Sequence, residues 1–459
     1  MHREVVLLRP YSMFGERFVQ TFYEQFGLRS IVVHTGWKDR LLVENRFPTL
    51  SSKAVSAHYM LGPGGWPEIT EALRRDHRVV AVAPHEEGAV APLGQLAADL
   101  GLSWAQPEVL PAFRAKDSLK SLVRRNDPSV RLNHHCLVRS GEEAFRAASD
   151  RGIPRFVLKP DDGVGNTDVA FFDTADGPSG PAAYFEQHPG STLFEEYIGG
   201  EEYFVNGQVD AAGEVSVFGV SRYLRGPANG RENIELGIRS VLTADPRHQM
   251  LADYARTVMR ATGLVRSPFH LEAKVDDAGP CLIEVGARLG GDQTASLDGW
   301  RLGGSLDPVE VAVHYYATDE PHAPLEFDWA FHDSHPTGSV KGVSEQDGRV
   351  YQLQGIREVE ALPGFITWVR RLQVGDRLEV TRNLTSKPYA VEVWAPTPEA
   401  VDEVDRQVRE LVRWNSDPRA RARARGGARI AANLARKAVD SRPRWHMRRS
   451  GPMAPAVSW

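Results

Sequence analysis

Two glutamates in residues 269–292 are spaced so that they can share a metal ion. We predict short strands over residues 270–275 and 281–285, joined by a turn over residues 276–280. Because side chains alternate between the faces of a strand, Glu272 and Glu284 are expected to meet across this hairpin. Facing carboxylates are unfavourable unless a cation lies between them, and hard oxygen ligands suit Mg²⁺. The alternative is a strand pair with solvated acids on its outer face.

Groups that could contact phosphate or substrate accompany this hairpin. Arg288 and the Gly290-Gly291 pair follow it directly, and a forked cation beside flexible backbone suits phosphate oxygens. His270 shares the predicted face of Glu272, and Asp292 lies four residues past Arg288, so each could contact a substrate. The ordinary alternatives are a hydrogen-bonded structural histidine and an acid at a helix N-terminus.

A second group of signals predicts a phosphate-binding loop between two strands. Lys159 ends a strand predicted over residues 156–159, a glycine-containing loop follows over residues 160–166, and a strand resumes at Val169. Backbone N–H groups of such a loop can cover phosphates, and Lys159 would project to the same place. A Walker loop would instead open a helix, and a long hairpin turn that happens to contain glycine is the alternative. Lys116 opens a predicted helix, where a run of charges is usually a solvated face.

Two acidic segments could contact the rest of a ligand. Residues 192–203 pass from an apolar strand into glutamates and glycines, and could form a hinge whose backbone contacts a purine, with Glu202 near ribose hydroxyls. Surface acids are the alternative there. Glu87 follows a predicted strand that ends at Ala83, and ligands of open α/β sheets bind beyond the carboxyl ends of strands. Glu87 could equally complement the dipole of the next helix, predicted over residues 90–100.

The N-terminal elements that must position these groups alternate between strand and helix. We predict strands over residues 4–8 and 29–34, a helix over residues 14–26 from phenylalanines repeated every four residues, and a helix–strand unit over residues 66–83. This βαβ order predicts a small parallel sheet. No glycine-rich dinucleotide fingerprint follows the first strand, so a nicotinamide cofactor is disfavoured.

Antiparallel strands and helices are predicted for the rest of the chain. The predicted elements are strands over residues 205–220 with a turn at 210–213, a mobile polar loop over 222–235 that could cover a substrate, helices over 246–262 and 308–318, an α+β unit over 338–394, and a helix from Pro398, capped by Thr397, to about Trp414. The chain after Ser441 is rich in Arg and Pro and is predicted to be disordered.

Composition indicates a globular protein of about three domains, given 459 residues with a hydrophobic fraction of 42% and a charged fraction of 25%. No apolar run could span a membrane, the N-terminus lacks a cleavable signal pattern, and two cysteines argue against a disulfide framework, so we expect a cytoplasmic protein. From Arg419 onward, ten Arg and one Lys against one Asp give a net charge of +10, which leaves −15 on the remainder for the overall −5. An acidic body with a basic tail does not resemble a nucleic-acid-binding domain.

The order of these signals resembles the ATP-grasp superfamily of carboxylate–amine ligases, and within it the L-amino-acid ligases, which make dipeptides. The resemblance covers about residues 1–414, and includes the turn over residues 361–364. It implies an α/β plus α+β fold with five parts: an N-terminal Rossmann-like domain with a parallel sheet (1–112), a small ATP-grasp subdomain (113–190), a large ATP-grasp subdomain (191–330), a C-terminal lid (331–415) and a basic tail (416–459). This sequence departs from the pattern at Gly286, where many members have Asn, and at Asn166, where Ser is usual.

The resemblance also implies roles for single residues. Mg²⁺, with Mn²⁺ as the alternative ion, would be held by Glu272 and Glu284, and Arg288 would steady the γ-phosphate and the oxyanion formed on amine attack. The phosphates, adenine and ribose of ATP would be held by Lys116, Lys159, Gly163, Gly165, Asn166, Glu195, Glu196, Tyr197, Ile198 and Glu202. The candidate substrate contacts are Glu87, His270, Gly291 and Asp292.

The expected reaction follows from the chemistry of a carboxylate, which is a poor electrophile because attack adds charge to an anion. Transfer of the γ-phosphoryl group of ATP gives an acylphosphate, which an amine then attacks. A closing loop and lid are expected to exclude water from this intermediate. We therefore expect an ADP-forming ligase for small carboxylates and amines, in particular amino acids, with no nucleic-acid or membrane partner and compatible with a homodimer. The alternatives are a non-peptide amide or carboxylated product, or a nucleotide-binding subunit without turnover.

Overall fold

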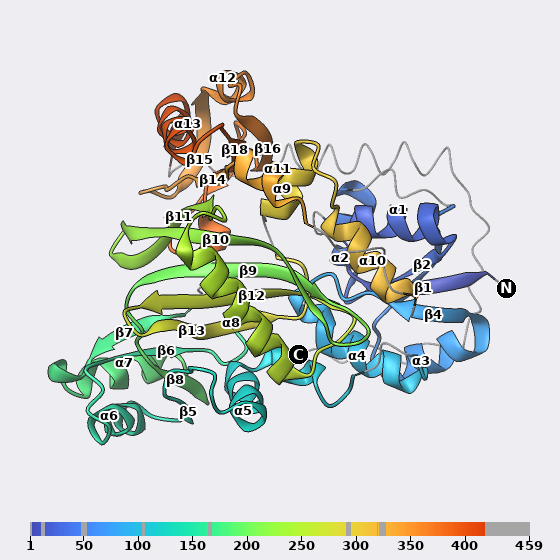
Figure 1. The fold of residues 1–459 in the computed structure, drawn as a ribbon, viewed down its shortest axis with the longest axis horizontal. Coiled ribbons are helices and arrows are strands. Elements are labelled where there is room, and N and C mark those ends of the chain that lie inside the picture. Colours follow the sequence, from blue (N-terminus) through green and yellow to red (C-terminus); the bar gives the residue numbers. More distant parts are fainter. Residues whose placement is uncertain are drawn as a thin grey trace, which may run out of the picture.

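The computed structural model describes residues 2–10, 14–46, 53–102, 106–163, 168–290, 295–318, 320 and 327–417. Within these residues the strands form an N-terminal parallel sheet, a small sheet, a long antiparallel sheet through the centre of the molecule and a short C-terminal sheet (Figure 1). The predicted fold class, a parallel-sheet domain followed by antiparallel sheets, is confirmed.

The N-terminal sheet has the strand order β3-β2-β1-β4, and all of its pairs are parallel. Its elements are β1 (Arg3–Leu8), α1 (Gly15–Phe26), β2 (Arg29–His34), α2 (Trp37–Arg46), β3 (Val55–Met60), α3 (Gly65–Asp76), β4 (Arg78–Val82), η1 (Glu87–Ala89) and α4 (Val90–Asp99). The phenylalanine repeat in α1 is confirmed as a core face, because Phe18 and Phe22 are fully buried. The helix ends at Gly27, whose left-handed φ of 61° lets its N–H reach carbonyls of the last turn. Two elements of this part were not predicted: β3, a half-buried edge strand of mixed polarity, and α2.

A small antiparallel sheet with the order β5-β8-β6-β7 follows the N-terminal sheet. This part contains η2 (Leu110–Arg114), α5 (Lys116–Asn126), β5 (His135–Val138), α6 (Gly141–Ser149), β6 (Arg155–Lys159), β7 (Ala170–Asp173), η3 (Thr174–Asp176), α7 (Ser179–Gln187) and β8 (Thr192–Glu196). Phe156 and Phe194 stack in its core with ring centroids 5.1 Å apart. The predicted strand–loop–strand pattern is therefore confirmed as the β6–β7 pair.

The central sheet is antiparallel, with the order β13-β12-β9-β10-β11-β14-β18-β16. Its strands are β9 (Glu201–Val209), β10 (Val215–Ala228), β11 (Arg231–Ser240), β12 (Ser267–Asp276), β13 (Gly279–Gly286), β14 (Thr337–Lys341), β16 (Phe365–Arg370) and β18 (Ala390–Trp394). Helix α8 (Pro246–Thr262) connects β11 to β12. The β12–β13 hairpin forms as predicted, with a tighter turn because the strands extend to Asp276 and from Gly279.

The prediction of a mobile polar loop over residues 222–235 is wrong. Strands β10 and β11 pair through this range, from Arg222 opposite Arg239 to Ala228 opposite Arg231. The turn between them is Asn229-Gly230, and both residues have positive φ, at 52° and 72°. Such turns match the twist of paired strands. The polarity of the segment reflects side chains that line a cavity, so it was no sign of irregular backbone.

The C-terminal elements complete the central sheet and add a second layer. They are α9 (Ala295–Arg301), α10 (Pro308–Ala317), α11 (Trp329–Ser334), β15 (Gly348–Gln354), α12 (Ile356–Glu360), β17 (Arg377–Leu378), η4 (Leu384–Ser386), α13 (Pro398–Leu411) and β19 (Arg413–Asp417). The hydroxyl of Thr397 caps α13 as predicted, but the helix ends at Leu411 because the chain then joins the sheet β17-β15-β19. Since β14 and β18 extend the central sheet past residue 331, the proposed boundary of a lid there stays a prediction.

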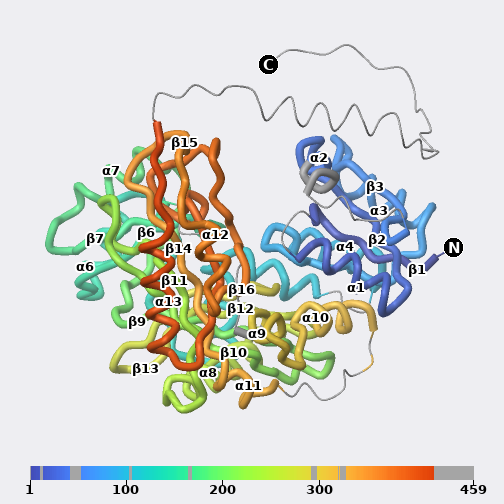
Figure 2. Tube along the Cα trace, turned by 90° about the horizontal axis from the view of Figure 1, so that it is seen from above, coloured from blue at the N-terminus to red at the C-terminus, as the bar shows by residue number. Residues whose placement is uncertain are grey.

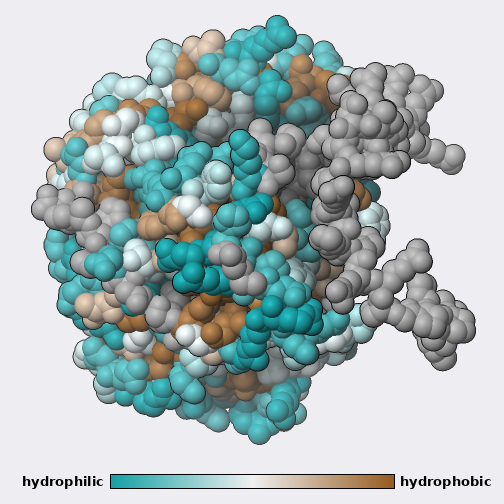
Figure 3. Space-filling model, turned by 90° about the vertical axis from the view of Figure 1, so that its right-hand side faces the viewer, coloured by the Kyte–Doolittle hydropathy of each residue, from teal (hydrophilic) through white to brown (hydrophobic). Residues whose placement is uncertain are grey.

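Helix α10 returns to the N-terminal part and lies beside α1 in both Figure 1 and Figure 2. Arg17 of α1 forms an ion pair with Asp307 at the start of α10, and its guanidinium lies over the ring of Trp300. The face that carries the N-terminal part is largely hydrophilic, with separate hydrophobic patches (Figure 3). Among the described helices, none combines the length and the apolar character needed to cross a membrane.

Candidate active site

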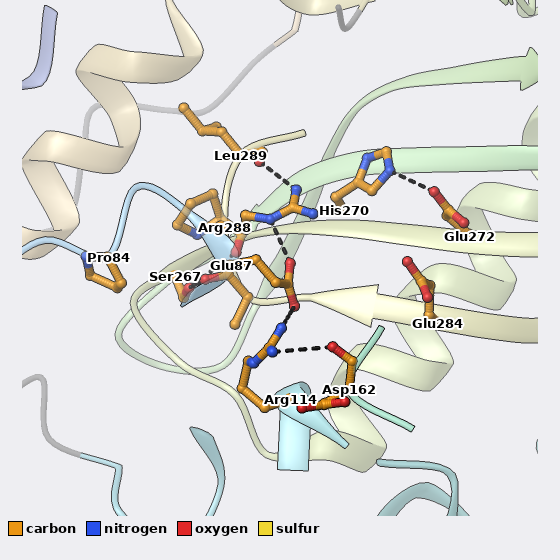
Figure 4. A network of polar contacts seen from close by, with 12 residues as sticks. Pro84, Glu87, Arg114, Asp162, Ser267, His270, Glu272, Glu284, Arg288 and Leu289 are labelled. Atoms are coloured by element: carbon orange, nitrogen blue, oxygen red, sulfur yellow. Dashed lines mark hydrogen bonds and ion pairs between the residues drawn. The ribbon is translucent and has the colours of Figure 1, made fainter. Parts of the chain in front are cut away.

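The β12–β13 hairpin brings the two predicted metal ligands together. Glu272 lies directly opposite Glu284 in the strand register. Their side chains project to the same side of the hairpin (Figure 4). Glu272 accepts a hydrogen bond from the Tyr223 hydroxyl at 2.7 Å and lies 3.2 Å from Nε2 of His270. Burial alone would raise the pKa of Glu272, but the contact with His270, the charge of Arg225 and the hydrogen bond from Tyr223 lower it to about 2, so this carboxylate is ionised.

His270 lies next to Glu272, as the predicted strand face requires. Its Nδ1 lies 2.9 Å from the side-chain oxygen of Asn206, and its Nε2 lies 3.2 Å from Glu272. The ring is buried among these neighbours. His270 therefore fixes the orientation of Glu272, and its predicted contact with a substrate stays a prediction.

Lys116 connects the β12–β13 hairpin to the loop that contains Gly163. Its ammonium group lies 3.2 Å from the carboxylate of Glu284 and donates to the carbonyl oxygen of Gly163 at 2.7 Å. Its predicted alternative, a solvated face, is excluded because the side chain is only 12% exposed. Gly165 and Asn166 lie outside the described residues, as do Gly291 and Asp292.

Lys159 is buried with a second lysine around Glu195. The ammonium group of Lys159 lies 2.6 Å from the Glu195 carboxylate, and Lys120 donates to the same carboxylate and to the side chain of Asn133. Although burial raises the pKa of Glu195, the two lysines lower it to about 2. Lys120 was not predicted as a site residue, although it stands one helical turn after Lys116 in α5, a spacing that would have indicated a shared face.

The segment after β8, predicted to form a hinge, lies on the wall of a cavity. Its side chains point to neighbouring elements: the Glu196 carboxylate accepts from the backbone N–H of His134 at 3.2 Å, and the Tyr197 ring lies 4.5 Å from the Lys274 ammonium group. Lys274 also donates to the Ile198 carbonyl at 3.0 Å. Since Glu196, Tyr197 and Ile198 all line the first of two cavities, their backbone and side chains are accessible to a ligand there.

Glu202 is buried in an ion pair with Arg225, a residue that the sequence analysis missed. The distance between Nη2 of Arg225 and the Glu202 carboxylate is 2.5 Å. Nε and Nη1 of Arg225 are buried and have no hydrogen-bond partner among the described residues. Because an unsatisfied buried donor costs about 1–3 kcal/mol, these two groups indicate a ligand that supplies acceptors. Arg225 lines the first cavity.

Two cavities meet at this group of residues. The first, of about 900 Å³, lies between the small sheet and the central sheet, and the second, of about 1170 Å³, reaches toward the N-terminal part. Both are lined by Lys116, Gly163, Tyr223, Glu235, Glu272, Glu284 and Leu384. The predicted metal ligands therefore lie on the wall that the two cavities share.

The second cavity is lined by Arg288 and Glu87, which contact each other. Nε of Arg288 donates to the Glu87 carboxylate at 2.6 Å, and Nη1 of Arg288 donates to the Leu289 carbonyl at 2.9 Å. Arg114 lies on the other side of Glu87, with 3.7 Å between the charged groups (Figure 4). The structure thus brings Arg288 into the same cavity as Glu272 and Glu284.

The C-terminal part contributes residues that the sequence analysis did not single out. Leu384 of η4 lines both cavities, and Lys341 of β14 lines the second and forms an ion pair with buried Glu235. Lys387 lies 3.2 Å from the same carboxylate. Lys341 reaches the site because β14 pairs with β11, a long-range contact that no local pattern indicates.

Comparisons with known proteins agree with this architecture. The model of a family described as ATP-grasp domain matches residues 181–296. An uncharacterized protein, y4rH of Sinorhizobium fredii, is 21% identical over 75% of this chain and 70% of its own length. Dapdiamide A synthase of Enterobacter agglomerans is 24% identical over 48% of this chain, and the match spans 51% of that enzyme. The solved structure of an L-amino acid ligase from Bacillus licheniformis has a TM-score of 0.69 at 15% identity, covering 90% of this chain and 98% of that chain.

Proposed function

We propose that this chain, whose residues 181–296 match the model of an ATP-grasp domain, is a carboxylate–amine ligase that activates the carboxylate of an amino acid or a related acid with ATP and joins it to an amine. One observation carries the proposal. The two cavities share a wall that is lined by Glu272, Glu284 and Lys116. Lys159 and the predicted hinge residues line the first cavity, and Arg288 lines the second. This wall is where a phosphoryl group would pass from nucleotide to substrate.

The first cavity suits ATP. Its hinge, formed by residues 195–198, would contact the adenine through its backbone, and Glu202 would accept hydrogen bonds from the ribose hydroxyls. Lys116 and Lys159 would bind phosphate oxygens. Arg225 would supply two further donors that lack a partner among the described residues.

Members of the superfamily generally use ATP together with Mg²⁺, and the residues of this site fit that ion. Glu272 and Glu284 are hard oxygen donors in facing register. No group of three or more His, Cys, Asp or Glu that could hold a metal occurs in the described part of the chain, so phosphate oxygens and water would complete the shell. When bound, Mg²⁺ would neutralise negative charge on the phosphates.

The side chains around the second cavity would serve the two chemical steps, formation of the acylphosphate and attack of the amine. A carboxylate oxygen of the substrate attacks the γ-phosphorus, the bond to ADP breaks, and an acylphosphate forms. The amine nitrogen then attacks the acyl carbon, phosphate leaves, and the amine loses a proton. Lys116, Lys159 and Arg288 offset the negative charge in both steps, which is the main requirement of phosphoryl transfer. Leu384 would help to exclude water from the intermediate.

The two named relatives support an amino-acid substrate and an amide product. One is an L-amino acid ligase, and the other is dapdiamide A synthase. We therefore propose a dipeptide or a similar amide as the product, with a non-peptide amide as the alternative for the same acyl donor. His270, Gly291 and Asp292 remain our proposed substrate contacts, and a different role is proposed for Glu87 below.

A screen of amino-acid pairs for ADP release, with product identification by mass spectrometry, tests the proposal. We expect at least one pair to release ADP with a product whose mass equals the two substrates minus one water. A double variant, Glu272→Gln with Glu284→Gln, should abolish the signal and thus excludes a contaminating ATPase. If no acid–amine pair gives ADP release above that variant, the ligase assignment is wrong.

A further inference from the structure

Glu87 and Arg288 join two parts of the molecule that are far apart in the sequence. Glu87 opens η1, directly after the loop that follows β4 of the parallel sheet, whereas Arg288 stands two residues past the end of β13. The contact between them is short, at 2.6 Å from Nε to a carboxylate oxygen. Figure 4 shows the Glu87 carboxylate lying between the guanidinium groups of Arg288 and Arg114.

This contact leaves a defined part of Arg288 for a ligand. Nε is used by Glu87 and Nη1 by the Leu289 carbonyl, and these are the hydrogen bonds that the guanidinium makes to the described residues. Hydrogen-bond acceptors at these two nitrogens hold the planar guanidinium group in one orientation. The Nη2 corner is therefore presented in a fixed direction, while the side chain remains 17% exposed in the second cavity.

Gly286 provides the space in which the pair forms. A Cβ atom at this position would lie 3.1 Å from the Glu87 carboxylate oxygen and 3.3 Å from Cζ of Arg288. These separations are tighter than ordinary contacts, so any side chain would push at least one partner away. The glycine is thus matched to the contact between the two charged residues.

Arg114 extends the same arrangement toward the nucleotide cavity. Its Nη1 lies 3.7 Å from the Glu87 carboxylate, and its Nη2 donates to the Asp162 carbonyl at 3.2 Å. Asp162 precedes Gly163, whose carbonyl accepts from Lys116. Glu87 is therefore connected to both the Arg288 side and the phosphate-loop side of the site.

We infer that Glu87 is a positioning residue that holds Arg288 in its active orientation in the space left by Gly286, and that it is not a contact for the substrate amine. The inference rests on the proposed function and deepens it. Removing a charged acceptor from a guanidinium fork should affect the step in which that fork stabilises developing charge. A residue that bound the amine would instead change the KM of the amine.

Steady-state kinetics of Glu87→Gln, Arg288→Ala and the double variant test this role. We expect Glu87→Gln to lower kcat about 10- to 100-fold, with the KM values for ATP and the amine within about threefold of the wild type. In the Arg288→Ala background, Glu87→Gln should lower kcat by less than about twofold, because the guanidinium group that Glu87 positions is absent. The inference is wrong if the kcat losses of the two single variants multiply in the double variant, or if Glu87→Gln changes only the KM of the amine.

Two matched variants separate positioning from general damage. Glu86→Gln changes the neighbouring acid, which pairs with Arg9, and should alter kcat less than about threefold. Gly286→Ala should lower kcat about 3- to 10-fold in the wild type and less than about twofold beside Glu87→Ala, where the crowded carboxylate is absent. Equal effects of Gly286→Ala in both backgrounds would contradict the proposed use of this space.

A measurement without turnover distinguishes failure of the inference from failure of the proposed function. In protein labelled with ¹⁵N at arginine, the Nε–H signal of Arg288 can be assigned as the one lost in Arg288→Lys. We expect this signal to shift and to exchange with solvent at least tenfold faster in Glu87→Gln, and to be unaffected in Glu86→Gln. If Glu87→Gln leaves the Nε–H signal of Arg288 unchanged, the proposed pairing is wrong, whether or not the enzyme turns over.

Discussion

The ammonium group of Lys159 lies 2.6 Å from the carboxylate of Glu195, and both groups are buried in the wall of the first cavity. Lys120 donates to the same carboxylate, so two lysines share one glutamate. One positive charge therefore remains in excess at the place where we propose the phosphates bind. The side chain of Glu195 thus belongs to the interior of the fold, and the residue itself lies in a strand that pairs with β5 on one side and β6 on the other.

Glu195→Gln is expected to destabilise the protein by about 3 kcal/mol. The change leaves Lys120, which is fully buried, without its counter-charge, and an unpaired buried charge is costly. Chemical unfolding followed by circular dichroism measures the difference. Glu196→Gln is the matched control, because the Glu196 carboxylate accepts only from the backbone of His134 in the described part of the chain, and the change should cost less than about 1 kcal/mol. Equal losses for the two variants would contradict the assignment of a structural role to Glu195.

Glu272→Gln and Glu284→Gln are each expected to raise the Mg²⁺ concentration needed for half-maximal ADP release by about tenfold or more. Loss of a charged oxygen ligand weakens the site directly. Tyr223→Phe, which removes the 2.7 Å hydrogen bond to Glu272 and the 3.3 Å contact with Nε2 of His270, should have a smaller effect in the same direction. Titration of activity with Mg²⁺ and with Mn²⁺ gives the comparison. An unchanged metal requirement in both glutamine variants would show that the metal lies elsewhere.

Arg288→Ala is expected to keep the fold and the affinity for ATP but to lower kcat by about 100- to 1000-fold. The guanidinium lines the second cavity, away from the hinge, so its loss affects charge that develops during the reaction more than ground-state binding. Calorimetric titration with ATP and measurement of kcat on the same preparation provide both values. Normal turnover of this variant would refute the role of Arg288.

Arg225→Lys is expected to weaken ATP binding by about 10- to 100-fold. Lysine can keep the ion pair with Glu202 but cannot reproduce the two donors, Nε and Nη1, that lack partners among the described residues. Arg222→Lys is the matched control on the same strand, because Arg222 pairs with Glu201 in a partly exposed position. The control should change the dissociation constant less than about threefold. Identical constants for the two variants would mean that Arg225 does not contact the nucleotide.

Local patterns were sufficient for the parts of the site that lie within one element. The meeting of Glu272 and Glu284 follows from strand alternation and a short turn, and both are properties of residues close in the chain. Lys159 could likewise be placed in the site, because it ends the strand that leads into the glycine-containing loop. The fold class could be predicted because the order of strands and helices limits the possible layers.

Residues that reach the site through long-range packing could not be found this way. Arg225 and Tyr223 lie in a segment whose polarity suggested a loop, although pairing with β9 and β11 makes it a strand. Lys341 enters the second cavity because β14 extends the central sheet, a pairing across about 100 residues of chain that no local periodicity encodes. The contact between Glu87 and Arg288 depends on the docking of the N-terminal sheet, so the sequence could only indicate that each was near a ligand.

His85 is expected to make stability depend on pH between about 6.5 and 4. The ring follows β4, is 3% exposed and lies 6.0 Å from the ring of Phe18. Burial lowers its pKa from the usual 6.5 to about 4. The unfolded chain therefore takes up a proton below pH 6.5 that the folded chain does not, so stability is fully present above pH 6.5 and decreases as the pH falls toward 4.

The free energy of unfolding should consequently be about 2 kcal/mol lower at pH 5 than at pH 7.5 on account of His85 alone. In His85→Leu this part of the difference should disappear, while any cost of the altered packing is the same at both pH values and cancels. Glu195 and Glu272, whose pKa values are about 2, lose their contribution only below about pH 4.5 and do not disturb this window. Urea unfolding of both proteins at pH 5 and pH 7.5 measures the change. If His85→Leu keeps the full pH dependence of the wild type, another group takes up the proton, and burial of the His85 ring is not the cause of the lower free energy of unfolding at pH 5.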